Sequence, residues 1–358
     1  MNHFSTIRTQ LEKRGLDAVL INSEANRFYA SAFHTTGADD AVVLVTTKDS
    51  YLITDSRYTE AAEATLKDAK LVIRANAASY LDLIAQVFTE DGVKKAGFED
   101  AALTVKEFNA YNSGLDCELL PASDLFLELR QSKDADEIRR LKAAQKIADE
   151  ALTQLLEEIR PGMTELEISA RLQYLMLLRG AERMSFDPIV AGGPNSSMPH
   201  AVPSNRKIQD GDFLTIDFGC VYEGYCSDTT RTVAIGHATD EMRRVYQTVL
   251  EAQLAGIAKA KTGVIGKVVH ETAHDVIRSA GYGEYFGHGF GHSLGLEIHE
   301  PPYFNSRNEK PMPDCAAVSA EPGIYLPGKF GVRIEDVIIL HEDGCEDITG
   351  LPKDLRII

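Results

Sequence analysis

Acidic residues inside apolar, strand-like segments constrain the fold of this 358-residue chain more than any other feature. Asp217 lies within the apolar run 213–219, and Asp228 opens the β-branched run 228–233, with Gly224 in the turn segment between them. Two such runs joined through a glycine turn predict a β-hairpin. Because side chains alternate across a strand, one carboxylate from each arm can point to the same face.

The same arrangement of acids recurs near the C-terminus. Glu321 ends a short apolar run and Glu335 lies within the apolar run 331–340, which predicts a second hairpin with one acid in each arm. Arg333 comes two residues before Glu335 and is therefore expected on the same face. A single acid usually faces solvent. Asp217 and Glu335, however, have apolar neighbours, where an unpaired charge would be unfavourable and a bound cation would remove the penalty.

The glycine-rich segment 287–302 adds histidines to these acids. His288 and His292 have the spacing of helical zinc motifs, but alternating glycines disfavour a helix and the intervening glutamate is missing. Glycines instead let a compact loop present a histidine to a ligand. Carboxylates with one imidazole are the mixture that a pair of hard divalent cations prefers, and hydrolases use such pairs. The candidate ligands are Asp217, Asp228, His292, Glu321 and Glu335.

Four motifs carry a resemblance to a known family. They are the pair Asp217 and Asp228 eleven positions apart, GHGFGHSLGLEIHE at 287–300, SAEPGIY at 319–325 and VRIED at 332–336. Together they resemble the pita-bread metallopeptidases of family M24, in the branch of Xaa-Pro aminopeptidases and prolidases. The resemblance covers the whole chain. It implies an α/β N-terminal domain of the creatinase/prolidase type, followed by an α+β pita-bread catalytic domain with pseudo-twofold symmetry.

The resemblance also implies a role for each metal ligand. Asp217 would hold one metal ion, Asp228 and Glu335 would bridge both ions, and His292 and Glu321 would complete the other. Two such ions can lower the pKa of a shared water, so that a bridging hydroxide attacks the peptide carbonyl. Glu321 is expected to carry a proton to the leaving nitrogen. The family suggests manganese, with cobalt or zinc as alternatives in vitro.

Further residues match family positions that contact substrate. His299 is expected to polarise the scissile carbonyl, and His200 to touch the amide or the leaving group. His288 matches another substrate histidine, and Phe186 matches a position that lines the proline pocket. For each of these residues, the alternative is that it lies on the surface or in the core without contacting substrate. Arg333 is a candidate for binding the substrate carboxylate, although orienting the neighbouring acid is its alternative role.

The choice between Xaa-Pro activities depends on the substrate's carboxylate. A dipeptidase must bind the free carboxylate of proline, which a bidentate arginine does best. After His299-Glu300 the chain has Pro301-Pro302-Tyr303 instead of the arginine found near there in several prolidases. The absence favours an Xaa-Pro aminopeptidase, with an Xaa-Pro dipeptidase (prolidase) as the alternative. The five ligands disfavour an inactive binding module and a metal-free amidinohydrolase, and the N-terminal domain disfavours a methionine aminopeptidase.

Periodicity divides the chain into two predicted domains, residues 1–130 and 131–358. The first alternates a helix and apolar strands, expected at 4–14, 18–21, 41–45 and 51–53. The second opens with an amphipathic helix whose apolar positions run from Ile138 to Leu155. Thr164 and Glu167 form a capping box at the start of the next helix. The order helix, helix, hairpin is then expected again, with helices at 240–261 and 266–280.

Composition limits the partners of the chain. A net charge of −17 argues against nucleic acid and anionic membranes, since both require a basic protein surface. The five cysteines are odd in number and lack paired spacing, which is typical of free thiols in a reducing cytosol. No apolar run approaches a membrane span. We therefore expect a cytoplasmic enzyme for proline-containing peptides, and the family suggests a homodimer.

Overall fold

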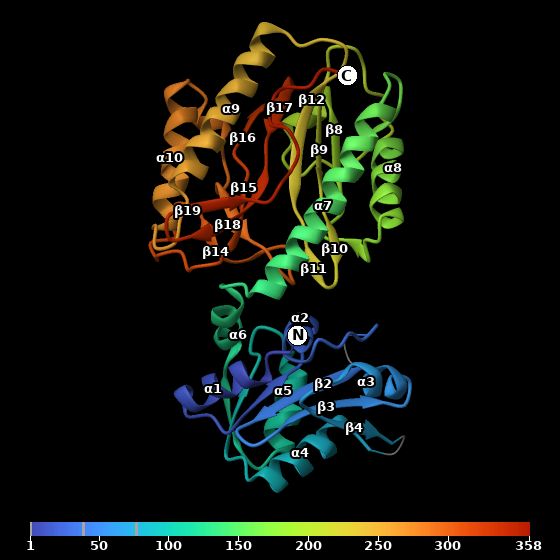
Figure 1. Ribbon diagram of the computed structural model, residues 1–358, viewed down its shortest axis with the longest axis vertical. Coiled ribbons are helices and arrows are strands. Elements are labelled where there is room, and N and C mark those ends of the chain that lie inside the picture. The colour runs from blue at the N-terminus through green and yellow to red at the C-terminus, as the bar shows by residue number, and fades with distance from the viewer. Residues whose placement is uncertain (1, 38–39, 76–77) are drawn as a thin grey trace. The chain divides into compact units, whose positions relative to one another are not determined.

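The computed structural model describes residues 2–37, 40–75 and 78–358, and the chain divides into two compact units, Met1–Leu129 and Arg130–Ile358 (Figure 1). The first unit is built on a six-stranded sheet in the order β4-β3-β2-β1-β5-β6. All residues of its three central strands are buried, so both faces of the sheet are covered. The strands are β1 (Ala18–Ile21), β2 (Ala41–Thr46), β3 (Ser50–Asp55), β4 (Lys70–Arg74), β5 (Lys95–Phe98) and β6 (Glu118–Pro121). The strands predicted in this region are confirmed.

Helices pack on this sheet through short apolar stripes. The predicted first helix is confirmed as α1 (Phe4–Arg14), which buries Phe4, Ile7 and Leu11 and ends at Gly15 in the left-handed region. Helix α4 (Tyr80–Asp91) adds Ile84 and Phe88 to the apolar core of this unit. The remaining helices are α2 (Glu24–Ser31), α3 (Thr59–Thr65), α5 (Val105–Gly114) and α6 (Ser123–Arg130).

Two larger sheets form the centre of the second unit, in the orders β12-β9-β8 and β14-β13-β15-β18-β19. The first contains β8 (Ile189–Gly192), β9 (Phe213–Phe218) and β12 (Thr229–Ala234). The second contains β13 (Gly291–Ser293), β14 (Glu300–Phe304), β15 (Ala317–Ala320), β18 (Asp336–His341) and β19 (Gly344–Asp347). Smaller sheets are formed by β7 (Arg183–Met184), β10 (Cys220–Tyr222) and β11 (Tyr225–Cys226), and by β16 (Gly323–Leu326) with β17 (Phe330–Arg333).

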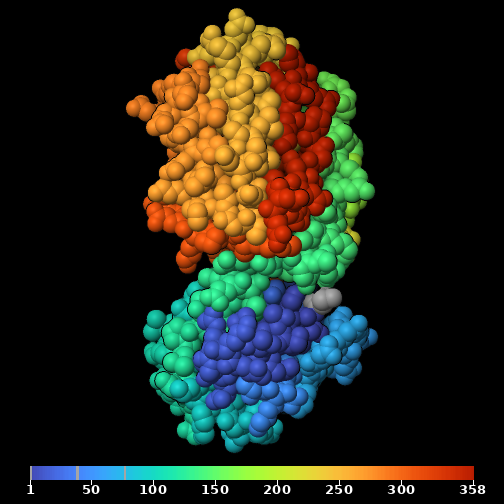
Figure 2. Space-filling model, turned by 60° about the vertical axis from the view of Figure 1, so that its left-hand side comes forward, coloured from blue at the N-terminus to red at the C-terminus, as the bar shows by residue number. Residues whose placement is uncertain are grey.

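Each large sheet is covered by a pair of helices. Helices α7 (Ala135–Glu158) and α8 (Glu165–Leu178) share an apolar core with β9, and α8 begins at the predicted Thr164 and Glu167 capping box. Helices α9 (Asp240–Lys259) and α10 (Gly266–Ser279) share a core with β15 and β18. Figure 2 shows α9 and α10 side by side on the face of this unit turned to the viewer. Among the helices in the described parts of the chain, none has the length and apolar character needed to cross a membrane.

Both predicted antiparallel pairings are present, but β15 and β18 do not form a hairpin, because β16 and β17 lie between them in the chain. Strands β9 and β12 are antiparallel with Asp217 opposite Thr230, and β15 and β18 are antiparallel with Ala320 opposite Asp336. The expectation of one continuous strand over 331–340 is wrong, because the chain leaves β17 at Arg333 and enters β18 only at Asp336. At this break the backbone N–H of Glu335 donates to the carbonyl of Thr230 at 3.0 Å. That hydrogen bond joins the two sheets where the predicted ligands lie.

Candidate metal centre

One cavity of about 830 Å³ in the second unit is lined by every site residue that the sequence predicts. Five of them are the candidate metal ligands Asp217, Asp228, His292, Glu321 and Glu335. The others are His200, His288, His299, Phe186 and Arg333. The ten residues come from several strands and loops, and the acids lie on or next to strands of the two large sheets.

Strand register explains how Asp217 and Asp228 come together. Asp217 pairs with Thr230, so Asp228 lies two residues away from that pair, on the same face of the hairpin. Close approach at this point requires glycine: a Cβ built on Gly219 would lie 1.9 Å from the carbonyl oxygen of Ser227. Both carboxylates are buried, with 8% of Asp217 and 4% of Asp228 exposed.

His292 is oriented toward the carboxylates. Its Nε2 lies 3.5 Å from Oδ2 of Asp228 and 3.3 Å from Oε1 of Glu321. Its Nδ1 lies 3.2 Å from the carbonyl oxygen of Ser293, which can only accept, so Nδ1 carries the proton and Nε2 presents its lone pair. Burial lowers the pKa of His292 and favours this neutral form. Ligand atoms of Asp228, His292 and Glu335 all lie within 4.8 Å of one another.

Hydroxyl groups hold two of the glutamates. Thr230 donates from Oγ1 to Oε2 of Glu335 at 2.7 Å, and Ser319 donates from Oγ to Oε1 of Glu321 at 3.1 Å. Neither hydroxyl residue is among the site residues predicted from the sequence. Thr230 follows Asp228 by two positions, and Ser319 precedes Glu321 by two. Side chains two residues apart on a strand point to the same face, so this spacing could have identified both hydroxyl groups as neighbours of the acids.

The electrostatics of this group fit bound cations. Burial, and then repulsion from neighbouring carboxylates, raises the pKa of Asp228 and of Glu335 well above the ordinary range. Burial also raises the pKa of Glu321. In the described part of the chain, Oδ1 of Asp217 is buried without a hydrogen-bond partner. Divalent cations would engage this oxygen and offset the repulsion, so the residues fit a centre for such ions.

Arg333 makes four hydrogen bonds within the protein. Its guanidinium donates to Oδ2 of Asp217 at 2.5 Å and to Oγ1 of Thr230 at 3.0 Å. It also donates to the hydroxyl of Tyr325 at 2.8 Å and to the carbonyl of Pro199 at 3.3 Å. Of the two roles expected for Arg333, this geometry favours orienting the acids over binding a substrate carboxylate.

Tyr325 connects Arg333 to His288. Nδ1 of His288 lies 2.9 Å from the carbonyl of Gly289 and therefore donates to it, which leaves Nε2 to accept from the Tyr325 hydroxyl at 3.0 Å. Both nitrogens of His288 are thus engaged with the protein. Tyr325 is not among the site residues predicted from the sequence, because its position follows from the β16–β17 pair, which was not predicted either.

Exposed imidazoles and an apolar wall complete the cavity. The His299 ring lies edge-on to that of His292, with centroids 4.3 Å apart, and both His299 and His200 are exposed. Apolar side chains line the adjoining wall, among them Phe186, Pro188, Ile189, Val202 and Ile298.

The residue after His299 is anchored by buried charges. Glu300 is 3% exposed, accepts a hydrogen bond from the Arg130 guanidinium and lies 3.5 Å from Nζ of Lys133. Lys133 in turn donates to Oγ of Ser293 at 3.0 Å, next to His292. These contacts fix the segment that carries His292 and His299.

Comparisons with known proteins agree with this geometry. Residues 139–342 match the model of metallopeptidase family M24, and residues 4–132 match the Creatinase/Prolidase N-terminal domain. The chain is 32% identical to an Xaa-Pro dipeptidase of Pyrococcus horikoshii over 96% of each chain. It is 42% identical to the solved Xaa-Pro dipeptidase from Bacillus anthracis, with a TM-score of 0.95 over 99% of each chain. It is 38% identical to an X-Pro aminopeptidase from Thermotoga maritima, with a TM-score of 0.92 over 100% of each chain.

These matches confirm the resemblance and the fold class expected from the motifs. The N-terminal unit is of the creatinase/prolidase type, and the catalytic unit has the pita-bread fold. Activity in this family implies divalent metal ions, which the carboxylate and histidine residues of the cavity fit. The chain belongs to metallopeptidase family M24 and is a metallo-exopeptidase.

Proposed function

We propose that this chain is an Xaa-Pro dipeptidase that uses two divalent metal ions. The observation that carries the proposal is the cavity in which buried carboxylates lie beside an apolar wall. The carboxylates and His292 suit a hydrolytic metal centre. The wall around Phe186 suits the ring of a proline, because a ligand site combines apolar area with a few polar groups.

The names of the relatives support a dipeptide substrate. Proteins similar to this chain over nearly its whole length, from Pyrococcus horikoshii and Bacillus anthracis, are named Xaa-Pro dipeptidases. This support outweighs the preference for an aminopeptidase, which depended on a single absent arginine after His299. Dipeptidase action is therefore the main proposal.

The proposed mechanism assigns a task to each side chain. When bound, the ions would activate a water molecule and polarise the scissile carbonyl. They would be held by Asp217, Asp228, His292, Glu321 and Glu335.

Two cavity residues would handle the proton and the developing charge. Glu321, with 18% of its side chain exposed and one oxygen held by Ser319, would carry the proton to the proline nitrogen. His299 would donate a hydrogen bond to the carbonyl oxygen as negative charge develops there.

The substrate carboxylate needs a donor other than Arg333. The guanidinium of Arg333 already makes four hydrogen bonds within the protein, including one to Asp217, and both nitrogens of His288 are engaged. We assign the carboxylate to the exposed imidazole of His200, which lines the same cavity. An imidazole N–H can donate to a carboxylate oxygen.

A second candidate, Xaa-Pro aminopeptidase, is favoured by one observation. Among the described residues that line the cavity, Arg333 is the only arginine or lysine. A longer peptide has no carboxylate after its proline and would not require a free cation in the cavity. The relative from Thermotoga maritima is named an X-Pro aminopeptidase.

Kinetics on three matched substrates distinguish the two candidates. We expect metal-loaded protein to cleave Ala-Pro with a kcat/KM roughly 100-fold above that for Ala-Pro-NH₂, because the amide leaves the carboxylate-binding group unpaired. Ala-Pro-Ala should be as poor a substrate as the amide. Equal or better cleavage of the tripeptide would reject the dipeptidase and support the aminopeptidase. The variant His200→Ala should lower the ratio of Ala-Pro to Ala-Pro-NH₂ cleavage without lowering metal content.

A further inference from the structure

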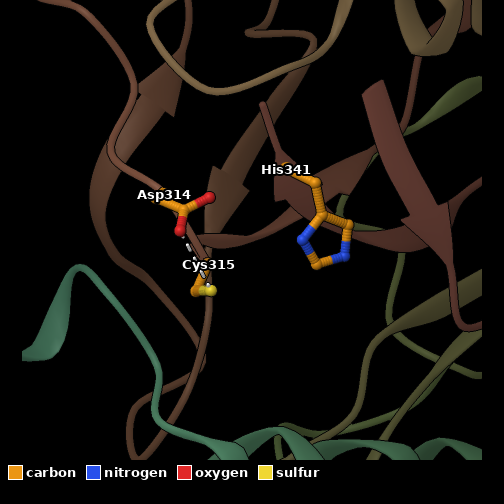
Figure 3. A group of neighbouring side chains, drawn as sticks. All are labelled: Asp314, Cys315 and His341. Atoms are coloured by element: carbon orange, nitrogen blue, oxygen red, sulfur yellow. Dashed lines mark hydrogen bonds between the residues drawn. The ribbon is translucent and has the colours of Figure 1, made fainter. Parts of the chain in front are cut away.

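A second cluster of metal-ligating side chains lies at the opposite end of the strands that lead to Glu321 and Glu335. Asp314, Cys315 and His341 each offer one ligand atom, and these atoms lie within 4.8 Å of one another. Figure 3 shows Asp314 and Cys315 next to each other, with His341 on the neighbouring strand and one ring nitrogen turned toward them. The described lining of the catalytic cavity does not include these residues.

Backbone hydrogen bonds hold the three residues in place. Strands β15 and β18 pair Ala317 with Ile339, and just beyond this pair the N–H of Leu340 donates to the carbonyl of Ala316 at 2.9 Å. The N–H of Cys315 donates to the carbonyl of Leu340 at 3.0 Å. The N–H of Thr262 donates to the carbonyl of His341 at 2.9 Å. The backbone positions of Cys315 and His341 are therefore fixed by the fold before an ion binds.

Side-chain geometry at this cluster suits a tetrahedral ion. Oδ2 of Asp314 lies 3.5 Å from Sγ of Cys315. Zinc bonds of about 2.0 to 2.3 Å in tetrahedral geometry place neighbouring ligand atoms about 3.3 to 3.8 Å apart. The His341 nitrogen needs to move by no more than roughly 1.5 Å to reach such spacing, which side-chain rotation at a strand end supplies. Oδ1 of Asp314 accepts from Thr262 Oγ1 at 2.9 Å, an outer contact of the kind that orients ligating carboxylates.

The backbone at Cys315 is unusual for a residue with a side chain. Its φ of 55° lies in the left-handed region, which favours glycine. Such a conformation persists when the surroundings hold it, and it often marks a functional position. Here it places a thiol between a carboxylate and an imidazole.

We propose that Asp314, Cys315 and His341 form a separate zinc site whose fourth position is open to water. Sulfur and imidazole ligands select zinc over the hard cations that suit a carboxylate-rich centre. On binding, the Cys315 S–H bond breaks, the proton passes to solvent and the thiolate sulfur bonds to Zn²⁺, with no change of oxidation state. The ion joins β15 to β18 about 20 Å along the strands from Glu321. The proposal of this zinc site does not depend on which substrate the catalytic cavity binds.

Cobalt provides a spectroscopic test on the full chain. Co²⁺ titrated into metal-depleted protein should produce thiolate-to-cobalt charge-transfer absorption that saturates at one ion per chain and disappears when Zn²⁺ is added. The catalytic cavity has no sulfur ligand among its described lining residues and cannot give this band. Cys315→Ser and His341→Gln should abolish or strongly weaken it. Cys345→Ser is the matched control, because Cys345 lies on β19 in the same sheet and is similarly half-buried. Cys345 does not belong to the cluster, so this variant should retain the band.

Site-resolved alkylation gives an independent measurement. With free Zn²⁺ at roughly ten times its Kd, mass action predicts roughly tenfold slower reaction of Cys315 with iodoacetamide, followed by mass spectrometry of its peptide. Cys345 and Cys117 in the same sample should react at unchanged rates. Cys315→Gly removes the thiol while suiting the left-handed backbone, so loss of the cobalt band in this variant cannot be attributed to unfolding. No band in the wild-type chain, a band that persists in Cys315→Ser, or equal alkylation with and without Zn²⁺ would overturn the proposal.

Discussion

The guanidinium of Arg333 holds Oδ2 of Asp217 at 2.5 Å, and among the described residues the other carboxylate oxygen, Oδ1, has no hydrogen-bond partner. Both side chains are buried, with 4% of Arg333 exposed and 8% of Asp217. One oxygen is therefore fixed by the protein, and the other is left for a cation. This division explains why a buried arginine can lie beside a metal centre without competing for its ligand.

Replacing Arg333 with lysine should weaken metal binding. A lysine cannot contact Asp217, Thr230, Tyr325 and the Pro199 carbonyl together, because it lacks the planar fork of the guanidinium. We expect metal affinity to fall by about 10- to 100-fold, as measured by competition with a chelator of known affinity. Arg171→Lys is the control, since Arg171 pairs with Glu158 in a more exposed site. Unchanged affinity in Arg333→Lys would show that Arg333 does not orient the ligands.

Glu335→Gln should weaken metal binding without destabilising the metal-free protein. The carboxylate is buried beside other carboxylates, so removing its charge relieves repulsion in the metal-free protein. We expect the metal-free variant to be at least as stable as the wild type in urea unfolding. The wild type should gain stability when Mn²⁺ is added, and the variant should lose most of this gain. Elemental analysis that found two ions per chain in Glu335→Gln would contradict the bridging role proposed for Glu335.

Local patterns were enough to predict most elements of the catalytic unit. The capping box at Thr164 and the apolar stripe of α7 depend on neighbouring residues, and both are present as expected. The approach of Asp217 to Asp228 also followed from alternation within a hairpin. These features need only the period of a helix or strand and the residue types at its ends.

Features set by contacts between sheets could not be predicted in the same way. The run 331–340 has no proline, and no glycine after Gly331, so no turn residue indicates that Arg333 pairs toward β16 whereas Asp336 pairs toward β15. The hydrogen bonds of Arg333 include one to Tyr325 on the paired strand β16 and one to the carbonyl of Pro199, which a distant segment brings to it. The ion pairs of Glu300 with Arg130 and Lys133 likewise join residues far apart in the sequence.

His299→Ala should reduce turnover and retain the metal ions. The proposed contact of His299 is made chiefly to the oxygen on which negative charge develops, so its loss acts on kcat. We expect kcat for Ala-Pro to fall by about 100-fold or more, with unchanged metal content by elemental analysis. Near-normal turnover in the metal-loaded variant would assign His299 a structural role only.

Glu300→Gln tests whether buried charges position His299. The substitution leaves Arg130 and Lys133 without their buried partner, which should destabilise the protein by about 3 kcal/mol. Because the proposed contact of His299 is to the developing charge, kcat should fall more than KM rises. Glu297→Gln is the matched control: Glu297 also pairs with Arg130, but 57% of its side chain is exposed. Equal kinetic effects of the two substitutions would reject the positioning role of Glu300.

Metal-dependent hydrolysis of Ala-Pro is the most direct test of the account. The full chain is depleted of metal with a chelator, and the initial rate of Ala-Pro cleavage is followed while Mn²⁺ is added back. We predict no cleavage in the depleted protein and full recovery as occupancy approaches two ions per chain. Full-rate cleavage by protein that elemental analysis shows to be metal-free would contradict the account, as would a fully loaded protein that does not cleave Ala-Pro.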